Sequence, residues 1–141
     1  MAKKINIVTG TVGQDSHIIG IKLLSRVLRE EGFETIELGG LTPPEEFIQV
    51  AQETSADAIM VSSLYGMAEL DLAGFKGKCV EAGLGDVILY LGGNLAVGRH
   101  DFKDDEKKFK EMGFDRVYPP EIDFAVVIND LKNDLKARGK I

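Results

Sequence analysis

Short apolar runs alternate with longer amphipathic segments five times along this chain, and no other feature restricts its fold so strongly. Several of the runs are apolar throughout, as parallel strands are when helices cover both faces of their sheet. The segments between the runs are long enough to be the helices that connect parallel strands. We therefore predict strands at Ile5–Val8, Thr35–Leu38, Ala58–Val61, Val87–Leu91 and Arg116–Tyr118.

The ends of the intervening helices are marked by glycine, proline and capping residues. Gly32, Gly83 and Gly113 each follow a charged, helix-favouring stretch, and glycine accepts the left-handed conformation that ends a helix. Thr42 precedes two prolines and Glu45, a pattern in which threonine caps the helix and glutamate completes a capping box. We predict helices over 18–31, 43–54, 69–82, 103–112 and 122–137.

This alternation predicts a single α/β domain over residues 1–141. Right-handed crossovers between parallel strands place helices on both faces of the sheet. The common five-stranded solution is the flavodoxin-like (Rossmann-like) order 2-1-3-4-5, which has its switch point between strands 1 and 3. We therefore expect a five-stranded parallel sheet of that order.

Composition argues against two classes of partner. The net charge of −6 disfavours a nucleic acid, because binding one requires Lys and Arg to neutralise phosphates. No stretch approaches the roughly 20 apolar residues of a membrane-spanning helix, so we expect no membrane partner. The single cysteine, Cys79, cannot form a disulfide within the chain, and the N-terminus has no signal-peptide pattern. We expect a cytoplasmic protein.

The candidate site lies in three connections of the predicted sheet. Ligands of such sheets bind beyond the carboxyl ends of the strands, at the switch point. The connections that meet there are Gly10–His17, Ser62–Gly66 and Gly92–His100.

The first connection contains a histidine that could bind a metal. Asp15 could accept a hydrogen bond from one ring nitrogen of His17 and leave the other nitrogen for the metal. Gly20, one helical turn later, would let a large group approach the helix. The alternative is that Asp15 or Ser16 only caps the helix and His17 lies on the surface, as is common for an isolated Asp-x-His.

The other two connections also allow two interpretations each. The hydroxyls of Ser62 and Ser63 could hydrogen-bond a buried ligand nitrogen, or they could cap local backbone groups. Gly92 and Gly93 could let the backbone approach a ligand, or they could form only a tight turn. Taken one at a time, these residues do not decide between a binding site and ordinary structure.

Taken together, the motifs Asp15-x-His17-x-x-Gly20, Ser62-x-Leu64 and Gly92-Gly93 resemble the signature of base-off, histidine-on cobalamin-binding domains. Three further segments narrow the likeness to the small (sigma) subunits of glutamate mutase, also called methylaspartate mutase. These segments are Ser62–Gly66, Tyr90–Gly98 and Asp115–Tyr118. The similarity covers nearly the whole chain.

The resemblance implies a role for each signature residue. His17 would replace the cofactor's own dimethylbenzimidazole base as the lower axial ligand of cobalt, and Asp15 would orient His17. The displaced nucleotide tail would run between the sheet and the first helix, where Ser62 hydrogen-bonds the base and Leu64 packs beside it. The implied cofactor-binding residues are Gly13, Gln14, Asp15, Ser16, His17, Ile18, Gly20, Ser62, Ser63, Leu64, Gly92, Gly93, Asn94, Leu95, Ala96 and Val97.

The resemblance also implies an enzyme that needs a second subunit. Glutamate mutases use adenosylcobalamin (coenzyme B12) to interconvert L-glutamate and 3-methylaspartate by a radical mechanism. Arg99 is the nearest arginine to the three connections, and a single arginine is too few to indicate a site for a dicarboxylate substrate. The resemblance likewise implies no catalytic residue on this chain. The substrate would lie on a large TIM-barrel subunit, in a heterotetramer of two small and two large subunits.

The sequence also allows other functions. The chain could be the small subunit of another adenosylcobalamin-dependent mutase, or a corrinoid methyl carrier, although such carriers usually have a helical domain before the cobalamin domain. A phospho-receiver domain needs an aspartate at the end of strand 3, where this chain has Ser62 and Ser63. A flavodoxin-type carrier needs aromatic residues around its flavin, and this chain has no tryptophan.

Overall fold

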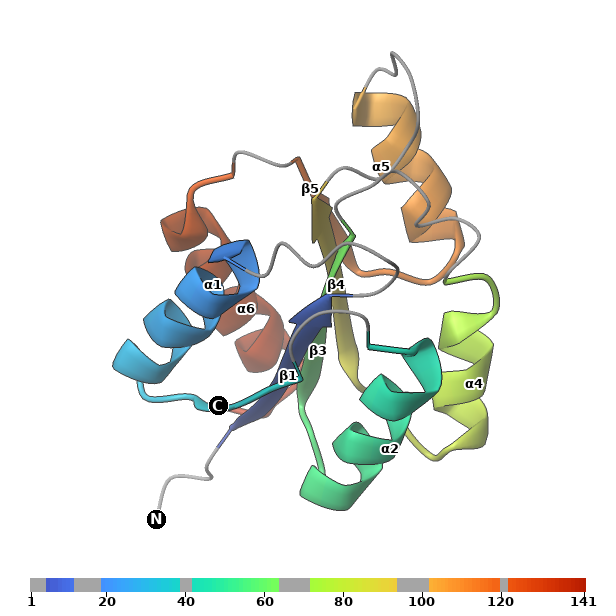
Figure 1. Cartoon of the computed structure of the whole chain (residues 1–141), viewed down its shortest axis with the longest axis horizontal. Helices are drawn as coiled ribbons and strands as arrows, with labels where there is room; N and C mark the ends of the chain where they lie inside the picture. Colours follow the sequence, from blue (N-terminus) through green and yellow to red (C-terminus); the bar gives the residue numbers. More distant parts are fainter. Residues whose placement is uncertain (1–4, 12–18, 39–41, 64–71, 94–101, 120–121) are drawn as a thin grey trace.

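The five strands of the computed structural model form one parallel sheet in the order β2-β1-β3-β4-β5 (Figure 1), which confirms the predicted fold class. The structure describes residues 5–11, 19–38, 42–63, 72–93, 102–119 and 122–141. The strands are β1 (Asn6–Thr11), β2 (Glu34–Glu37), β3 (Ala58–Ser63), β4 (Ile88–Gly93) and β5 (Arg116–Tyr118). The helices are α1 (Ile19–Glu30), α2 (Pro44–Thr54), α4 (Phe75–Glu81), α5 (Phe102–Glu111) and α6 (Phe124–Ala137).

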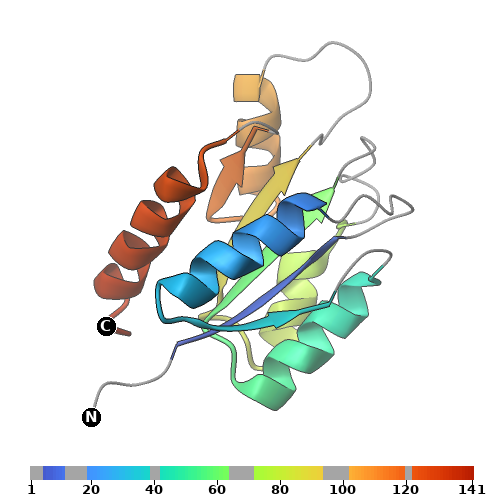
Figure 2. The ribbon, with the colours of Figure 1, turned by 60° about the vertical axis from the view of Figure 1, so that its left-hand side comes forward.

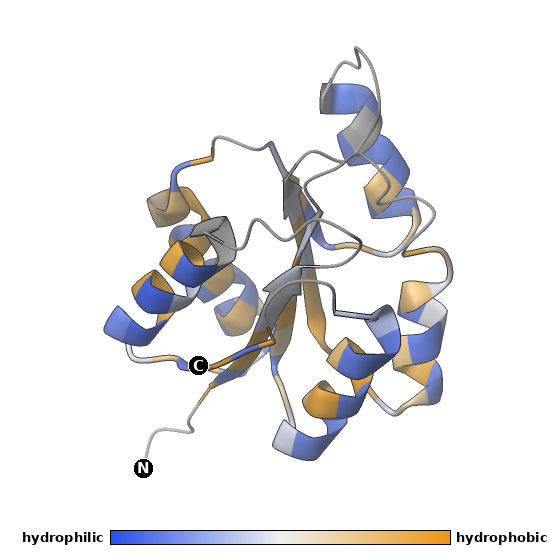
Figure 3. Ribbon diagram, in the orientation of Figure 1, coloured by the Kyte–Doolittle hydropathy of each residue, from blue (hydrophilic) through white to orange (hydrophobic). Residues whose placement is uncertain are grey.

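Helices cover both faces of the sheet (Figure 2). On one face, α1 and α6 contribute Leu28 and Leu131 to a core shared with the strands. On the other face, α2, α4 and α5 contribute Phe47, Phe75 and Phe109. Alternate residues of each strand face opposite layers, and Figure 3 shows hydrophobic strands between helices that carry both hydrophobic and hydrophilic residues. This double burial explains the continuously apolar runs in the sequence.

Predicted helix boundaries differ from the structure by one or two residues in several places, as at α6, which begins at Phe124 rather than at residue 122. Two helix starts have a physical reason for the difference. The helix expected over 69–82 begins at Phe75, because residues 72–74 form a turn and Gly74 takes a positive φ of 75°. In α2 the N-cap is Pro43, one residue later than predicted, and Thr42 donates a hydrogen bond to the Leu38 carbonyl. Acidic and capping residues in the sequence therefore predicted roughly where α2 and α4 begin but not the first residue of either helix.

The glycines predicted to end helices are confirmed. Gly32, Gly83 and Gly113 all have positive φ. At Gly113 the φ is 109°, and a Cβ atom there would lie 2.5 Å from the Cβ of Lys76. Both the backbone conformation and the lack of space thus require glycine at this position. Cys79 is fully buried in α4, and burial raises the pKa of its thiol to about 11.

Candidate functional site

A row of four paired residues crosses the sheet at the carboxyl ends of its strands. Thr11 of β1 pairs with Ser62 of β3, Ser62 pairs with Gly92 of β4, and Gly92 pairs with Tyr118 of β5. Residues paired in this way lie on the same face of a sheet. Tyr118 packs in the core shared with α1 and α6, so the row faces that helical layer. We name these four residues the carboxyl-end row.

The hydroxyl groups along β1 differ in whether they have a partner. Thr9 and Ser25 of α1 are both fully buried, and their hydroxyl oxygens are 2.8 Å apart in a hydrogen bond. Thr11 is also fully buried, yet within the described part of the chain its Oγ1 has no hydrogen-bond partner. A buried hydroxyl without a partner is unfavourable and unusual. The carboxyl-end row therefore contains a polar group that the protein itself does not satisfy.

Two glycines near this row differ in whether the surrounding atoms require a glycine. A Cβ atom at Gly10 would lie 2.9 Å from the ring of Phe47, which is closer than packed atoms approach, so the core requires glycine there. A Cβ atom at Gly92 would lie 3.8 Å from Tyr118, an ordinary van der Waals distance. The described protein atoms thus leave room for a side chain at position 92, although the residue there is glycine.

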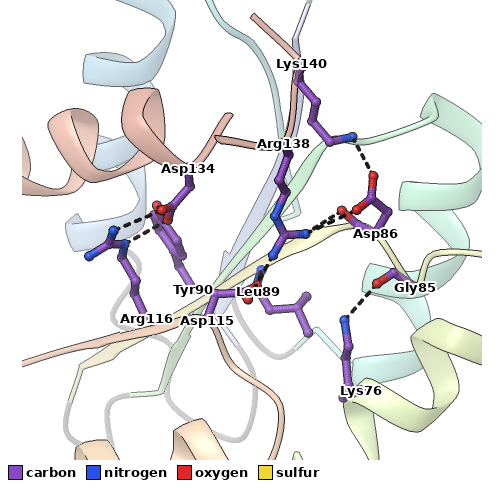
Figure 4. Close-up of polar contacts among 10 residues, drawn as sticks. All are labelled: Lys76, Gly85, Asp86, Leu89, Tyr90, Asp115, Arg116, Asp134, Arg138 and Lys140. Atoms are coloured by element: carbon purple, nitrogen blue, oxygen red, sulfur yellow. Dashed lines mark hydrogen bonds and ion pairs between the residues drawn. The ribbon is translucent and has the colours of Figure 1, made fainter. Parts of the chain in front are cut away.

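The outer end of the row is fixed by a network between the sheet and α6. The Tyr90 and Tyr118 rings meet edge to face with centroids 5.5 Å apart. Tyr90 donates a hydrogen bond to Asp134, as does Arg116 through two nitrogens at 2.8 and 2.9 Å (Figure 4). Tyr118 donates a hydrogen bond to Asp130 at 2.8 Å. Burial and these carboxylates raise the pKa of both tyrosines, which therefore stay neutral.

Charged groups at the amino ends of the strands, opposite the carboxyl-end row, are paired with one another. Asp57, only 2% exposed, accepts a hydrogen bond from the Asn6 backbone N–H and lies 3.1 Å from the Lys140 ammonium. Arg138 pairs with Asp115 at 2.9 Å (Figure 4). These contacts join the C-terminal segment to the amino ends of the strands. In contrast to the Thr11 hydroxyl, the buried carboxylate of Asp57 has its partners within the chain.

Most of the residues predicted to form the site lie outside the described residues. The structure does describe Ser62, which is half-buried, and Gly92, and it places both in the carboxyl-end row. Ser63 and Gly93 pair with each other as the last residues of β3 and β4, and Gly20 lies in the first turn of α1. The predicted residues outside the described part are Gly13, Gln14, Asp15, Ser16, His17, Ile18, Leu64, Asn94, Leu95, Ala96 and Val97.

Sequence reasoning missed Thr11 and Tyr118 as members of the row. β1 was predicted to end at Val8 but continues to Thr11, so Thr11 was assigned to the connection rather than to the sheet. The alternation of Thr9, Gly10 and Thr11 was the available signal, because threonine favours strands and two hydroxyls two residues apart share one face.

Two further features are absent from the residues that the structure describes. No helix there is long and apolar enough to cross a membrane. The same residues contain no cluster of three or more His, Cys, Asp or Glu side chains placed to hold a metal ion.

Known proteins similar to this chain bind B12 or are named as mutase subunits. The B12 binding domain family matches residues 5–109. The glutamate mutase sigma subunit of Carboxydothermus hydrogenoformans is 51% identical over 133 residues, which covers 94% of this chain and 97% of that protein. The glutamate mutase sigma subunit of Escherichia coli O157:H7 is 48% identical over 139 residues, covering 99% of this chain and 93% of that protein.

The fold is also found in a solved structure. A cobalamin-binding protein from Desulfitobacterium hafniense DCB-2 has a TM-score of 0.72 to this chain at 21% identity. The match covers 94% of this chain and 60% of that protein, so this chain corresponds to less than two thirds of its length. At this identity the likeness supports the fold alone.

Proposed function

Because the chain belongs to the family of glutamate mutase sigma subunits and contains a B12 binding domain, we propose that it is the cobalamin-binding subunit of a glutamate mutase. The observation that carries this proposal is the 48–51% identity to sigma subunits over nearly the whole length of both chains. The reaction is the interconversion of L-glutamate and 3-methylaspartate. We further propose that the cofactor is adenosylcobalamin, which supplies radical chemistry when bound.

The carboxyl-end row fits the nucleotide tail of such a cofactor. A buried hydroxyl without a partner, a half-buried serine and a glycine with unused space lie side by side on the face covered by α1 and α6. These are the features that a buried, partly polar ligand needs: hydrogen-bonding groups and room. We propose that Ser62 and Gly92 contact the tail, as do Gly20, Ser63, Gly93 and the predicted residues outside the described part.

We propose that His17 would hold the cobalt of the cofactor through one ring nitrogen, and that Asp15 would orient the His17 ring. A carboxylate that accepts the other N–H of a ligating histidine fixes its tautomer and raises its basicity. Both residues lie outside the described residues, so this assignment rests on the sequence motif and family membership.

A second subunit completes the proposed enzyme. We propose a large TIM-barrel subunit that binds the amino acid substrate and covers the cofactor held by this chain, in a heterotetramer of two small and two large subunits. We place this complex in the cytoplasm, where the buried free thiol of Cys79 would stay reduced.

Reconstitution tests the proposed function directly. The full chain, the large subunit of a glutamate mutase and adenosylcobalamin should together convert glutamate to 3-methylaspartate, and omission of any component should abolish conversion. Conversion of a different substrate, such as 2-methyleneglutarate, in place of glutamate would assign the chain to another mutase. Cobalamin-dependent methyl transfer without isomerisation would assign it to the corrinoid carriers.

Gly92→Ala should separate cofactor binding from folding. The free protein has room for the methyl group, and alanine stabilises a strand interior relative to glycine, so the free energy of unfolding should be unchanged or higher by up to about 1 kcal/mol. The methyl group would occupy space left for the tail, so cobalamin affinity should fall at least about 10-fold. Denaturant unfolding and cobalamin titration measure the two effects.

Gly10→Ala is the matched control for Gly92→Ala. Its Cβ atom would collide with the Phe47 ring, so it should lower the free energy of unfolding by about 1–3 kcal/mol. If the two variants lost stability equally, Gly92 would be a structural glycine, and its assignment to the cofactor site would be wrong.

A further inference from the structure

Thr11 is the one described residue with a buried side-chain polar atom that has no hydrogen-bond partner. Its exposed fraction is 0%. Its backbone is satisfied, because the Thr11 carbonyl accepts a hydrogen bond from the Thr42 N–H at 3.0 Å and the residue pairs with Ser62 in the sheet. The missing partner therefore concerns the hydroxyl alone.

The surroundings of Thr11 indicate where its partner comes from. Two residues earlier on the same face, the Thr9 hydroxyl is bonded to Ser25 of α1. One strand over, Ser62 is level with Thr11 and half-buried, and Gly92 beyond it leaves space. Adjacent strands are about 4.8 Å apart, so one bound group can reach both Thr11 and Ser62. The Thr11 hydroxyl thus lies beside the place proposed for the nucleotide tail.

We propose that the Thr11 hydroxyl is a hydrogen-bonding group for the nucleotide tail of the cobalamin. The inference rests on the proposed function, and it adds to the site a residue of β1 outside the cobalamin signature. In the free protein this hydroxyl is buried without a partner, which costs stability. In the complex a polar atom of the tail becomes its partner. The Thr11 hydroxyl therefore lowers the stability of the free chain and raises its affinity for cobalamin. Residues of binding sites commonly have this pair of effects.

Thr11→Val tests this proposal because valine keeps the shape of threonine and removes only the hydroxyl. Without cofactor, the variant should be more stable, with a Tm higher by roughly 2–5 °C, since an unsatisfied buried group is removed and valine favours strands. With the large subunit present, cobalamin affinity should fall about 5- to 10-fold, the loss of one hydrogen bond.

Cobinamide, a corrinoid that lacks the nucleotide tail, separates the tail from the rest of the cofactor. Thr11→Val should leave cobinamide affinity within about 2-fold of that of the natural chain. An equal loss of affinity for cobalamin and cobinamide would overturn the proposal, and so would unchanged cobalamin affinity. If the natural chain itself bound no cobalamin, the proposed function would fail instead, so the two failures can be told apart.

Thr9→Val is the matched control on the same face of the same strand. Its hydroxyl already has a partner, so the variant leaves Ser25 unsatisfied and should lower Tm. The two substitutions should therefore shift Tm in opposite directions. A lower Tm for both would show that the Thr11 hydroxyl is satisfied within the folded free protein, and the proposal would be wrong. Thr11→Ser, which keeps the hydroxyl, should keep most of the cobalamin affinity.

Discussion

Replacing His17 with glycine should remove the protein ligand from cobalt and lower cobalamin affinity or mutase turnover by more than about 100-fold. Loss of groups that only orient a metal ligand typically costs 10- to 100-fold, so loss of the ligand itself should cost more. The free energy of unfolding of the cofactor-free chain should change little, which separates this variant from one that fails to fold. Cobalamin titration, the mutase assay and denaturant unfolding measure the three quantities.

Spectroscopy identifies the ligand independently of activity. The chain has two histidines, so labelling with nitrogen-15 histidine and recording the paramagnetic spectrum of the Co(II) form should show coupling to a single labelled nitrogen. His100→Gly is the matched control and should retain that coupling, whereas His17→Gly should lose it. Coupling that persisted without His17, or that came from the cofactor's own base, would remove His17 from the proposed role.

Asp15→Asn should show the smaller effect of a group that orients the ligand. An amide can still contact the imidazole but carries no negative charge, so affinity or turnover should fall about 10- to 100-fold and the histidine coupling should remain. A loss as large as that of His17→Gly would mean that Asp15 does more than hold the ring.

The layered architecture could be predicted from the sequence because its determinants are local and repeated. Apolar runs such as Ala58–Val61 are continuous because helices cover both faces of the sheet, and the glycines at 32, 83 and 113 end helices by conformations that other residues rarely adopt. Strand order then followed from general rules of parallel sheets. Ser62 and Gly92 could be placed together because they lie near the carboxyl ends of neighbouring strands.

Other features depend on tertiary contacts that the sequence does not express locally. The lack of a partner for Thr11 is a property of the packed structure, visible only when every neighbouring group is known. Gly10 and Gly92 look alike in sequence, and only the distance to Phe47 or to Tyr118 distinguishes them. The start of α4 at Phe75 likewise depends on the conformation of Gly74, which overrides the helix signals before it.

Asp134→Ala should lower the free energy of unfolding by about 2–3 kcal/mol, more than a substitution that removes a single hydrogen bond. The carboxylate accepts hydrogen bonds from Tyr90 and from Arg116. Tyr90 is 2% exposed, so its hydroxyl would be left buried without its acceptor, which alone costs about 1–3 kcal/mol. Asp134→Asn keeps an acceptor for Tyr90 and should lose less. Denaturant unfolding at pH 7 measures both.

The same carboxylate should make stability sensitive to acid. Hydrogen bonds from Arg116 hold the pKa of Asp134 below its ordinary value. A carboxyl with a lowered pKa in the folded state contributes stability above its unfolded pKa, and this contribution is lost as the pH falls below about 5 toward the lowered value. The natural chain should therefore lose more stability between pH 7 and pH 3 than Asp134→Asn. An equal loss would show that Asp134 ionises alike in both states.

Asp130→Ala is the matched control, and it connects this network to the site. Asp130 accepts one hydrogen bond from Tyr118 and lies 3.5 Å from Arg116, so its loss should cost less stability than that of Asp134. Tyr118, however, is the member of the carboxyl-end row that borders Gly92. Asp130→Ala should therefore lower cobalamin affinity although its effect on the free energy of unfolding is small. Affinity unchanged in both variants would mean that the tyrosine pair supports the fold without shaping the cofactor site.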